Sequence, residues 1–347
     1  MITKKNITKI FFLFLFFHMS FWTLIPSISN VNLPLDTIEA LAWGSNLDWG
    51  FNKHPPLSAF ATEFIYSIFG SNDWAYYLLS QIFVVVAFIF VWKLANEIFE
   101  EKLYSLISVL ILSGIYFYNF TTPEFNVNVS QLPFWALTVY FFWKGINSKN
   151  RSDWVLFGIF SALGFLSKYL FIYLLVSLFL YFVFNLKKNK KLIPNYLLSI
   201  VISLIILVPH FIWLYENNFV TIFYGLSRSA LIDSSLINHL KNPLIFLIKQ
   251  TLILVPFFLM IFILLKKIKL KLNIQNKKTI FIISINLIPI VLVLITAIIS
   301  GAKIRTMWMT PFYLFFGIFF LEIFKKSIDL KRIKKFYIIF LFLFILS

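Results

Sequence analysis

The sequence of 347 residues contains no cysteine and only 14 acidic residues. The lack of cysteine excludes a disulfide framework and thiolate chemistry. Charged residues make up 13% of the chain and hydrophobic residues 60%, which excludes an ordinary soluble protein. The alternating hydrophobicity of a membrane β-barrel is also missing. Because backbone groups inside lipid must pair within their own segment, we predict an all-α, polytopic membrane protein.

Long apolar runs fill the chain, and about 20 apolar residues are enough for one helix to cross a bilayer. We predict about 11 transmembrane helices, at residues 7–29, 73–92, 103–119, 127–143, 153–166, 169–185, 194–214, 246–265, 279–299, 306–324 and 336–347. The last segment would be about 18 Å long, which is short of the ~30 Å hydrocarbon core. We therefore expect a truncated or unusually short version of a longer protein.

A single transmembrane domain over residues 1–347 is expected, without a soluble C-terminal domain. The basic start and the apolar stretch that follows it would also suit a cleaved signal peptide. That stretch is long for a signal peptide and no A-x-A cleavage site follows it, so we interpret it as an uncleaved first span. The first periplasmic loop, at about residues 30–72, is expected to carry short amphipathic helices.

The net charge of +17 suggests a nucleic-acid partner, but the positions of the cations argue against one. When the segments are threaded alternately from a cytoplasmic N-terminus, 24 of the 31 basic residues fall on the cytoplasmic side. This positive-inside bias predicts a cytoplasmic N-terminus and places the polar outer loops, and therefore the expected site, on the outer face of the membrane. The other basic residues are Lys53, Lys168, Arg228, Lys241, Lys249, Lys303 and Arg305.

The first outer loop contains the sequence NLPLDTIEALAWG. Asn32 can cap a helix whose first turn holds Pro34. Asp36 and Glu39 are three residues apart and would share one face of that helix. A carboxylate there can accept a proton from an acceptor hydroxyl, and we favour Asp36 over Glu39 as the base. The alternative is that Asp36 caps the helix and Glu39 is a solvated neighbour.

The string KHPPL is the most specific short motif in the chain. A second helix can start at Pro55 and Pro56, and a helix N-terminus attracts anions. Lys53 and His54 would add positive charge, so we predict a phosphate-binding site. The alternative is a loop turn with two incidental cations.

Three other outer segments supply candidate binding residues. TTPEFNVNV contains Glu124 and Asn126, although Asn126 would also suit a helix cap. GFLSKYL places Lys168 between two spans, where its alternative role is to extend to the membrane surface. GAKIRTMWMTP contains Lys303 and Arg305, which suit phosphate oxygens but would also anchor the chain at the interface.

A metal centre has little support in the sequence. His210, His239 and Glu216 are candidate ligands, but no H-E-x-x-H or similar spacing is present. We expect no cofactor, with a divalent metal as the weaker alternative. His18 in the first span is interpreted as a packed polar residue.

The sequence resembles the bacterial ArnT-like and dolichyl-phosphate-mannose protein mannosyltransferase family, whose members are membrane glycosyltransferases with the GT-C fold. The resemblance covers about residues 35–315, in the motifs LDTIEALAWG, WGFNKHPPLSAF, PEFNVNVSQLPFWAL, GFLSKY, PHFIWLYENNF and RTMWMTPFY. It implies a polyprenyl-phosphate-linked sugar donor and periplasmic transfer with inversion at the anomeric carbon. By motif position, it implies that Asp36 lies near the reaction centre and His54 at the donor phosphate. The family often has adjacent Asp and Glu, whereas Glu39 follows Asp36 by three residues.

We therefore predict a glycosyltransferase that moves a hexose or pentose to a periplasmic acceptor, namely lipid A, a surface glycan or a protein. The cations near the site would offset the charge on the leaving phosphate. If the acceptor were itself a phosphate, no base would be required and Asp36 would orient it. The alternative function is a transporter or flippase for a lipid-linked sugar. Transporters often have internal repeats and midplane sites, and no repeat is visible here.

Overall fold

The computed structural model describes residues 4–148, 150–186, 190–229, 235–269 and 275–346. Most of these residues are helical. Their one β feature is an isolated antiparallel bridge between Leu265 and Ile328. The predicted all-α class is therefore confirmed.

Four of the described helices are long and apolar enough to span a bilayer: α1 Lys4–Ser29, α4 Asp73–Ile98, α11 Ile193–Glu216 and α15 Lys277–Ser300. Two bent pairs bring the number to six if each pair is one span: α13 Asn238–Ile253 with α14 Val255–Leu264, and η5 Thr306–Tyr313 with α16 Phe316–Phe324. The chain is thus a multi-pass membrane protein. The predicted number of about 11 spans is not confirmed and stays a prediction.

The remaining helices are shorter. Most lie within the predicted segments, but several, including Leu35–Gly44, Leu57–Phe69 and Val220–Arg228, lie outside them, and the predicted segment 103–119 is divided into one α-helix and two 3-10 helices. Those in the first half are α2 Leu35–Gly44, α3 Leu57–Phe69, α5 Lys102–Leu110, η1 Ile111–Gly114, η2 Tyr116–Tyr118, α6 Val127–Ser130, α7 Leu132–Ser148 and α8 Arg151–Ser167. Those in the second half are η3 Tyr169–Phe171, α9 Ile172–Phe184, η4 Lys190–Leu192, α12 Val220–Arg228, η6 Leu330–Arg332 and α17 Ile333–Leu346. Apolar runs predict the helices within these segments because the backbone N–H and C=O groups of a membrane helix form hydrogen bonds within the same helix.

Helix α11 has one buried face and a large exposed apolar surface that suits contact with lipid. One face packs on α8 and on the loop before α3, and it buries Leu207, His210 and Trp213. Large apolar side chains on its other faces are exposed, namely Leu197, Val201, Leu204, Ile205, Val208 and Ile212. Such a surface would be unstable in water and is stable against acyl chains.

The helices α5 and α16 approach each other closely at Gly317. A Cβ atom built on Gly317 would lie 1.9 Å from the backbone oxygen of Ser108. Small residues permit such close contact between membrane helices.

We expect Gly317→Ala to destabilise the protein by about 1–3 kcal/mol, because the two backbones must move apart. The measurement is the thermal unfolding midpoint in detergent. Gly225→Ala is the matched control, because a Cβ atom there meets no atom within 4 Å. Equal midpoints for the two variants would contradict the close-packing argument.

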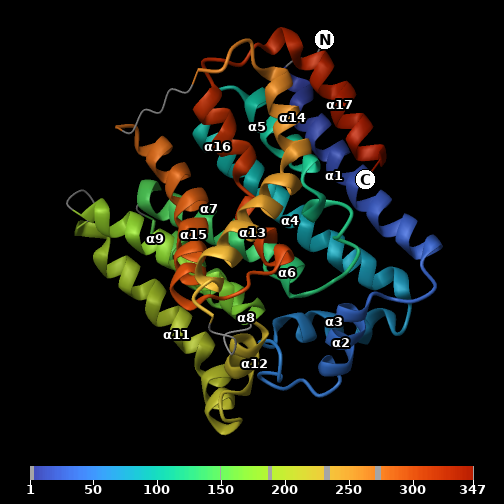
Figure 1. The fold of residues 1–347 in the computed structure, drawn as a ribbon, viewed down its shortest axis with the longest axis vertical. Coiled ribbons are helices and arrows are strands. Elements are labelled where there is room, and N and C mark those ends of the chain that lie inside the picture. The colour runs from blue at the N-terminus through green and yellow to red at the C-terminus, as the bar shows by residue number, and fades with distance from the viewer. Residues whose placement is uncertain (1–3, 149, 187–189, 230–234, 270–274, 347) are drawn as a thin grey trace.

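The helices α2, α3 and α12 gather at one end of the molecule, away from both termini (Figure 1). The first loop therefore contains two short helices, as predicted. The predicted cap is wrong, because the N-cap of α2 is Pro34 and no side chain caps the helix. Asn32 lies two residues before the cap, and its carbonyl oxygen instead accepts a hydrogen bond from the hydroxyl of Tyr77 at 3.4 Å.

Candidate active site

A cavity of about 590 Å³ lies where the loops and short helices of this end meet. Its walls come from α2, the loop before α3, the turn between α8 and η3, α12, and the loop before η5. The polar and charged side chains that line it include Asp36, Glu39, Lys53, His54, Lys168, Tyr224, Arg228 and Arg305. Segments that are far apart in sequence therefore bring acids and cations to one place.

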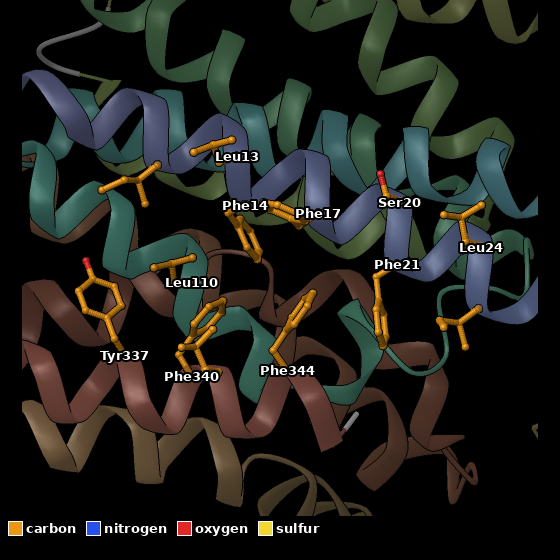
Figure 2. A pocket seen from close by; sticks show the side chains of 13 residues that line it. Leu13, Phe14, Phe17, Ser20, Phe21, Leu24, Leu110, Tyr337, Phe340 and Phe344 are labelled. Atoms are coloured by element: carbon orange, nitrogen blue, oxygen red, sulfur yellow. The ribbon is translucent and has the colours of Figure 1, made fainter.

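A second cavity, of about 600 Å³, is chemically different. It lies between α1 and α17, with Leu110 of α5 on a third side (Figure 2). Phenylalanine and aliphatic side chains make up most of its lining, and Ser20 and Tyr337 are the polar residues there. It contains no group suited to phosphate binding or proton transfer, so we place the candidate site in the charged cavity.

The loop before α3 is fixed to α11 and α12. The Thr221 hydroxyl donates a hydrogen bond to the Phe51 carbonyl at 2.5 Å. His210 Nδ1 lies 2.6 Å from the Trp49 carbonyl oxygen, and its Nε2 lies 2.9 Å from the hydroxyl of Tyr169. A Cβ atom on Gly50 would lie 2.3 Å from the Trp213 ring, so only glycine permits this approach. These contacts hold Lys53 and His54 at the cavity.

The candidate base is supported from behind by the next loop. The backbone N–H of Asp36 donates to Glu124 Oε1 at 3.4 Å, and Asn126 Nδ2 donates to Glu124 Oε2 at 3.3 Å. The Asn126 side chain also accepts from the backbone N–H groups of Asn128 and Val129, which caps α6. Glu124 therefore contacts Asp36 directly, Asn126 acts on Asp36 through Glu124, and neither lines this cavity.

The carboxyl of Asp36 has a raised pKa. Burial is the main cause and the charge of Glu39 adds to it, while Lys168, Lys53 and Arg228 oppose the shift. A carboxylate with a raised pKa is a stronger base than an ordinary aspartate. Glu39 forms an ion pair with Lys53.

Lys168 is the most deeply buried cation of the cavity. It donates a hydrogen bond to Asn128 Oδ1, and its Nζ lies 5.5 Å from the centroid of the Trp308 ring. Burial lowers the pKa of Lys168 to about 7, although the charge of Asp36 opposes this shift. An anion beside Lys168 would restore its charge, which makes this ammonium sensitive to a bound phosphate.

His54 does not supply the positive charge that the sequence suggested. Burial, with smaller contributions from Lys168 and Lys53, lowers the pKa of His54 to about 3, so the imidazole is neutral at pH 7. Its ring lies edge-on to Trp43 and Tyr224, at 5.9 Å and 6.4 Å between centroids. No described group hydrogen-bonds with the imidazole, which leaves an N–H for a ligand. The prediction of a cationic His54 is wrong for the substrate-free protein, since burial disfavours the charge.

The other predicted cations divide between two places. Arg305 lines the charged cavity, whereas Lys303 lies outside it in an adjoining pocket of about 440 Å³. Arg228, Tyr224 and Trp308 line the charged cavity but were not predicted as site residues. The sequence did single out Arg228, since it is one of the few cations outside the basic clusters.

The residues suggested for a metal do not form a cluster. Among the described residues, no group of three or more His, Asp and Glu side chains is placed to hold a metal ion. Both ring nitrogens of His210 face protein partners. His239 is turned toward the carbonyl oxygen of Ile298, at 2.7 Å from Nδ1.

Comparison with known proteins adds three findings. Residues 53–213 match the family model described as dolichyl-phosphate-mannose-protein mannosyltransferase. The lipopolysaccharide core galacturonosyltransferase RgtA from Rhizobium johnstonii is 20% identical over 188 residues, which are 54% of this chain and 38% of RgtA. A crystal structure of ArnT from Cupriavidus metallidurans, bound to undecaprenyl phosphate, is similar with a TM-score of 0.66 and 14% identity, over 96% of this chain and 61% of that one. The chain thus spans less than two thirds of the length of either relative.

Proposed function

We propose that the chain, which has a fold similar to that of ArnT and matches the mannosyltransferase family model over residues 53–213, is a glycosyltransferase that uses a polyprenyl-phosphate-linked sugar. The acceptor would be lipid A, a surface glycan or a protein. We place the chain in the inner membrane, with a cytoplasmic N-terminus and a periplasmic site, on the support of the positive-inside bias. The charged cavity then opens on the side opposite the basic clusters.

The observation that carries this proposal is the joint presence of a partly buried carboxylate, several cations and an apolar wall in one cavity. Asp36 supplies the carboxylate, and Lys168 and Arg228 are close enough to affect its pKa. The apolar wall would receive the first isoprene units of the donor and consists of Leu170, Ile172, Tyr173, Leu226 and Trp308. A water-soluble sugar phosphate would not require such a wall.

In the proposed reaction, the acceptor hydroxyl gives its proton to Asp36 as its oxygen attacks the anomeric carbon. The bond from that carbon to the phosphate oxygen breaks, and the phosphate leaves with the electron pair on the face opposite the attack, which inverts the anomeric centre. Lys168, Arg228 and the His54 N–H would stabilise the charge that develops on the leaving phosphate. We propose that these groups of the chain, without a cofactor, carry this step.

The experiment follows transfer of labelled sugar from a polyprenyl-phosphate donor in membranes that contain the protein. His54→Ala is expected to raise the donor KM about tenfold, because a hydrogen bond to a charged phosphate is lost. His54→Gln keeps a neutral donor group and should retain most of the affinity.

Two results would contradict the proposal. One is the lack of transfer by folded wild-type protein across donors and membrane acceptors. The other is a donor KM for His54→Ala equal to that of the wild type, which would remove His54 from the phosphate site.

A further inference from the structure

The apolar cavity between α1 and α17, which we call the intramembrane groove, takes no part in the proposed reaction. Its volume of about 600 Å³ is within the usual range for ligand pockets. Several of the side chains that line it are exposed, among them Leu13, Phe17, Leu24 and Leu341. Because α1 is long and apolar enough to span a bilayer, these side chains would contact acyl chains, so the groove is open to lipid.

The two helices run in the same direction beside the groove (Figure 2). Ring contacts join Phe14 to Phe340 at 5.8 Å and Phe21 to Phe344 at 5.6 Å between centroids. Both helices therefore begin at the same end of the groove. The lining residues of α1 fall within 10–25, a length of about 22 Å along the helix axis. That length exceeds one leaflet of the ~30 Å hydrocarbon core, so the groove can hold a whole acyl chain.

Basic residues lie at the end where both helices begin. Lys9 lies one turn before Leu13, and Lys334 lies one turn before Tyr337. Leu13 and Tyr337 line the groove, and residues three or four apart share a helix face, so both lysines lie on its side of their helices. Both lysines are exposed, and neither forms an ion pair within the described part of the chain. None of the described residues that line the groove is acidic.

The start of α17 is held in place by the end of α14. The backbone N–H of Asp329 donates to the Leu264 carbonyl at 2.8 Å. The Arg332 guanidinium donates to the Leu265 carbonyl. Arg332 is thus engaged within the protein, whereas Lys334 remains available to a ligand. Since this end of the helix is fixed before a ligand binds, the entropic cost of binding is lower.

We propose that the intramembrane groove binds an anionic phospholipid, with one acyl chain between α1 and α17 and the phosphate beside Lys9 and Lys334. The apolar lining suits the chain, and the two cations suit the head group. Tyr337 lies where these two parts meet, and tyrosine is common at the level of the head groups. With the orientation proposed above, the lipid belongs to the cytoplasmic leaflet. The inference does not depend on sugar transfer.

The proposed donor lipid does not account for this groove. Its phosphate would occupy the charged cavity, which lies among α2, α3 and α12 at the end of the molecule away from both termini (Figure 1). Lys9 and Lys334 instead lie near the starts of the first and last helices. A zwitterionic lipid would fill the apolar part equally well. Basic residues at a membrane surface favour anionic lipid, so the position of the two lysines selects the anionic head group.

The test uses the full chain in nanodiscs of phosphatidylcholine that contain a trace of a photoactivatable lipid. One probe is a phosphatidylglycerol with a diazirine in its acyl chain, and the other is a phosphatidylcholine with the same chain. Labelled peptides are identified by mass spectrometry. The test variant is Lys334→Gln, and Lys335→Gln is the matched control. Lys335 is also exposed, but it shares its face of α17 with Ile338 and Phe342, which do not line the groove.

We expect the phosphatidylglycerol probe to label the groove peptides of α1 and α17 about tenfold more than the phosphatidylcholine probe, since each exposed lysine contributes about threefold. Lys334→Gln should lower this preference about threefold, and Lys335→Gln should keep it. The phosphatidylcholine probe should label all three proteins equally, which shows that the variants retain the groove.

Equal labelling of these peptides by the two probes would overturn the inference and indicate contact with bulk lipid only. An equal preference in Lys334→Gln and Lys335→Gln would overturn it as well. So would displacement of the probe by unlabelled undecaprenyl phosphate but not by unlabelled phosphatidylglycerol, which would assign the groove to the donor lipid. Loss of labelling by both probes in a dimer would instead assign it to a second copy of the chain. Sugar transfer is not measured, so a failure of the proposed function would not affect the result.

Discussion

Asp36→Asn is expected to lower the rate of sugar transfer by about 10²–10⁴-fold, the usual contribution of a positioned general base. Donor affinity should change little, because asparagine keeps the shape of the side chain and the contact from its backbone N–H to Glu124. The measurement is single-turnover transfer of labelled sugar, with donor binding determined separately on the same preparation.

The control for this prediction is Glu39→Gln. Glu39 lines the same cavity but is paired with Lys53, so its loss should cost much less than the loss of Asp36. A near wild-type rate for Asp36→Asn would show that Asp36 orients the acceptor and does not remove its proton. That outcome would also indicate that an anionic oxygen of the acceptor, which needs no base, makes the attack.

The pH profile gives a second measure of the same residue. A base works in its deprotonated form, so activity falls as pH drops through the pKa of Asp36. Burial and the charge of Glu39 raise that pKa. The loss of activity toward acidic pH should therefore begin at a higher pH than for an enzyme whose base is an ordinary aspartate. Glu39→Gln removes one cause of the shift and should move the acidic limb to lower pH.

The helices were predictable because each membrane segment is encoded locally. Apolar runs, prolines and polar loops mark both ends of α1 and α15 to within three residues, and they mark the start of α4, which continues to Ile98, past its predicted end at residue 92. The side of the membrane is predicted by the bias of basic residues along the sequence, and it stays a prediction. That bias placed the outer loops together, and so predicted that Asp36 and Lys168 would share a site although they are far apart in sequence.

Other features depend on three-dimensional burial, which the sequence does not contain. His54 looks cationic in KHPPL, but its neutrality follows from the walls packed around it. Lys303 and Arg305 are two residues apart, yet Arg305 lines both the charged cavity and the adjoining pocket, and Lys303 only the adjoining pocket. Asn126 illustrates a residue with two roles, since it caps α6 and also supports Glu124 behind the candidate base.

Lys168 should control the alkaline side of the pH profile. Only its protonated form can stabilise the leaving phosphate, and burial lowers its pKa to about 7 in the free protein. As pH rises from 6 to 8, the charged fraction falls from about 90% to about 10%, so kcat/KM for the donor should fall about tenfold. The value of kcat should be less affected, because a bound phosphate raises the pKa of the ammonium.

Two substitutions separate charge from packing at this position. Lys168→Gln should lower kcat/KM by about 10²–10³-fold at pH 6, the usual cost of losing one positioned group that stabilises the transition state. Lys168→Arg keeps the positive charge at all accessible pH values. Its kcat/KM should therefore not fall between pH 6 and pH 8, whatever the absolute rate of the variant. Lys241→Gln should keep the wild-type profile. If Lys168→Arg instead showed the same alkaline limb as the wild type, another group would control it, and the buried ammonium would have no part in phosphate departure.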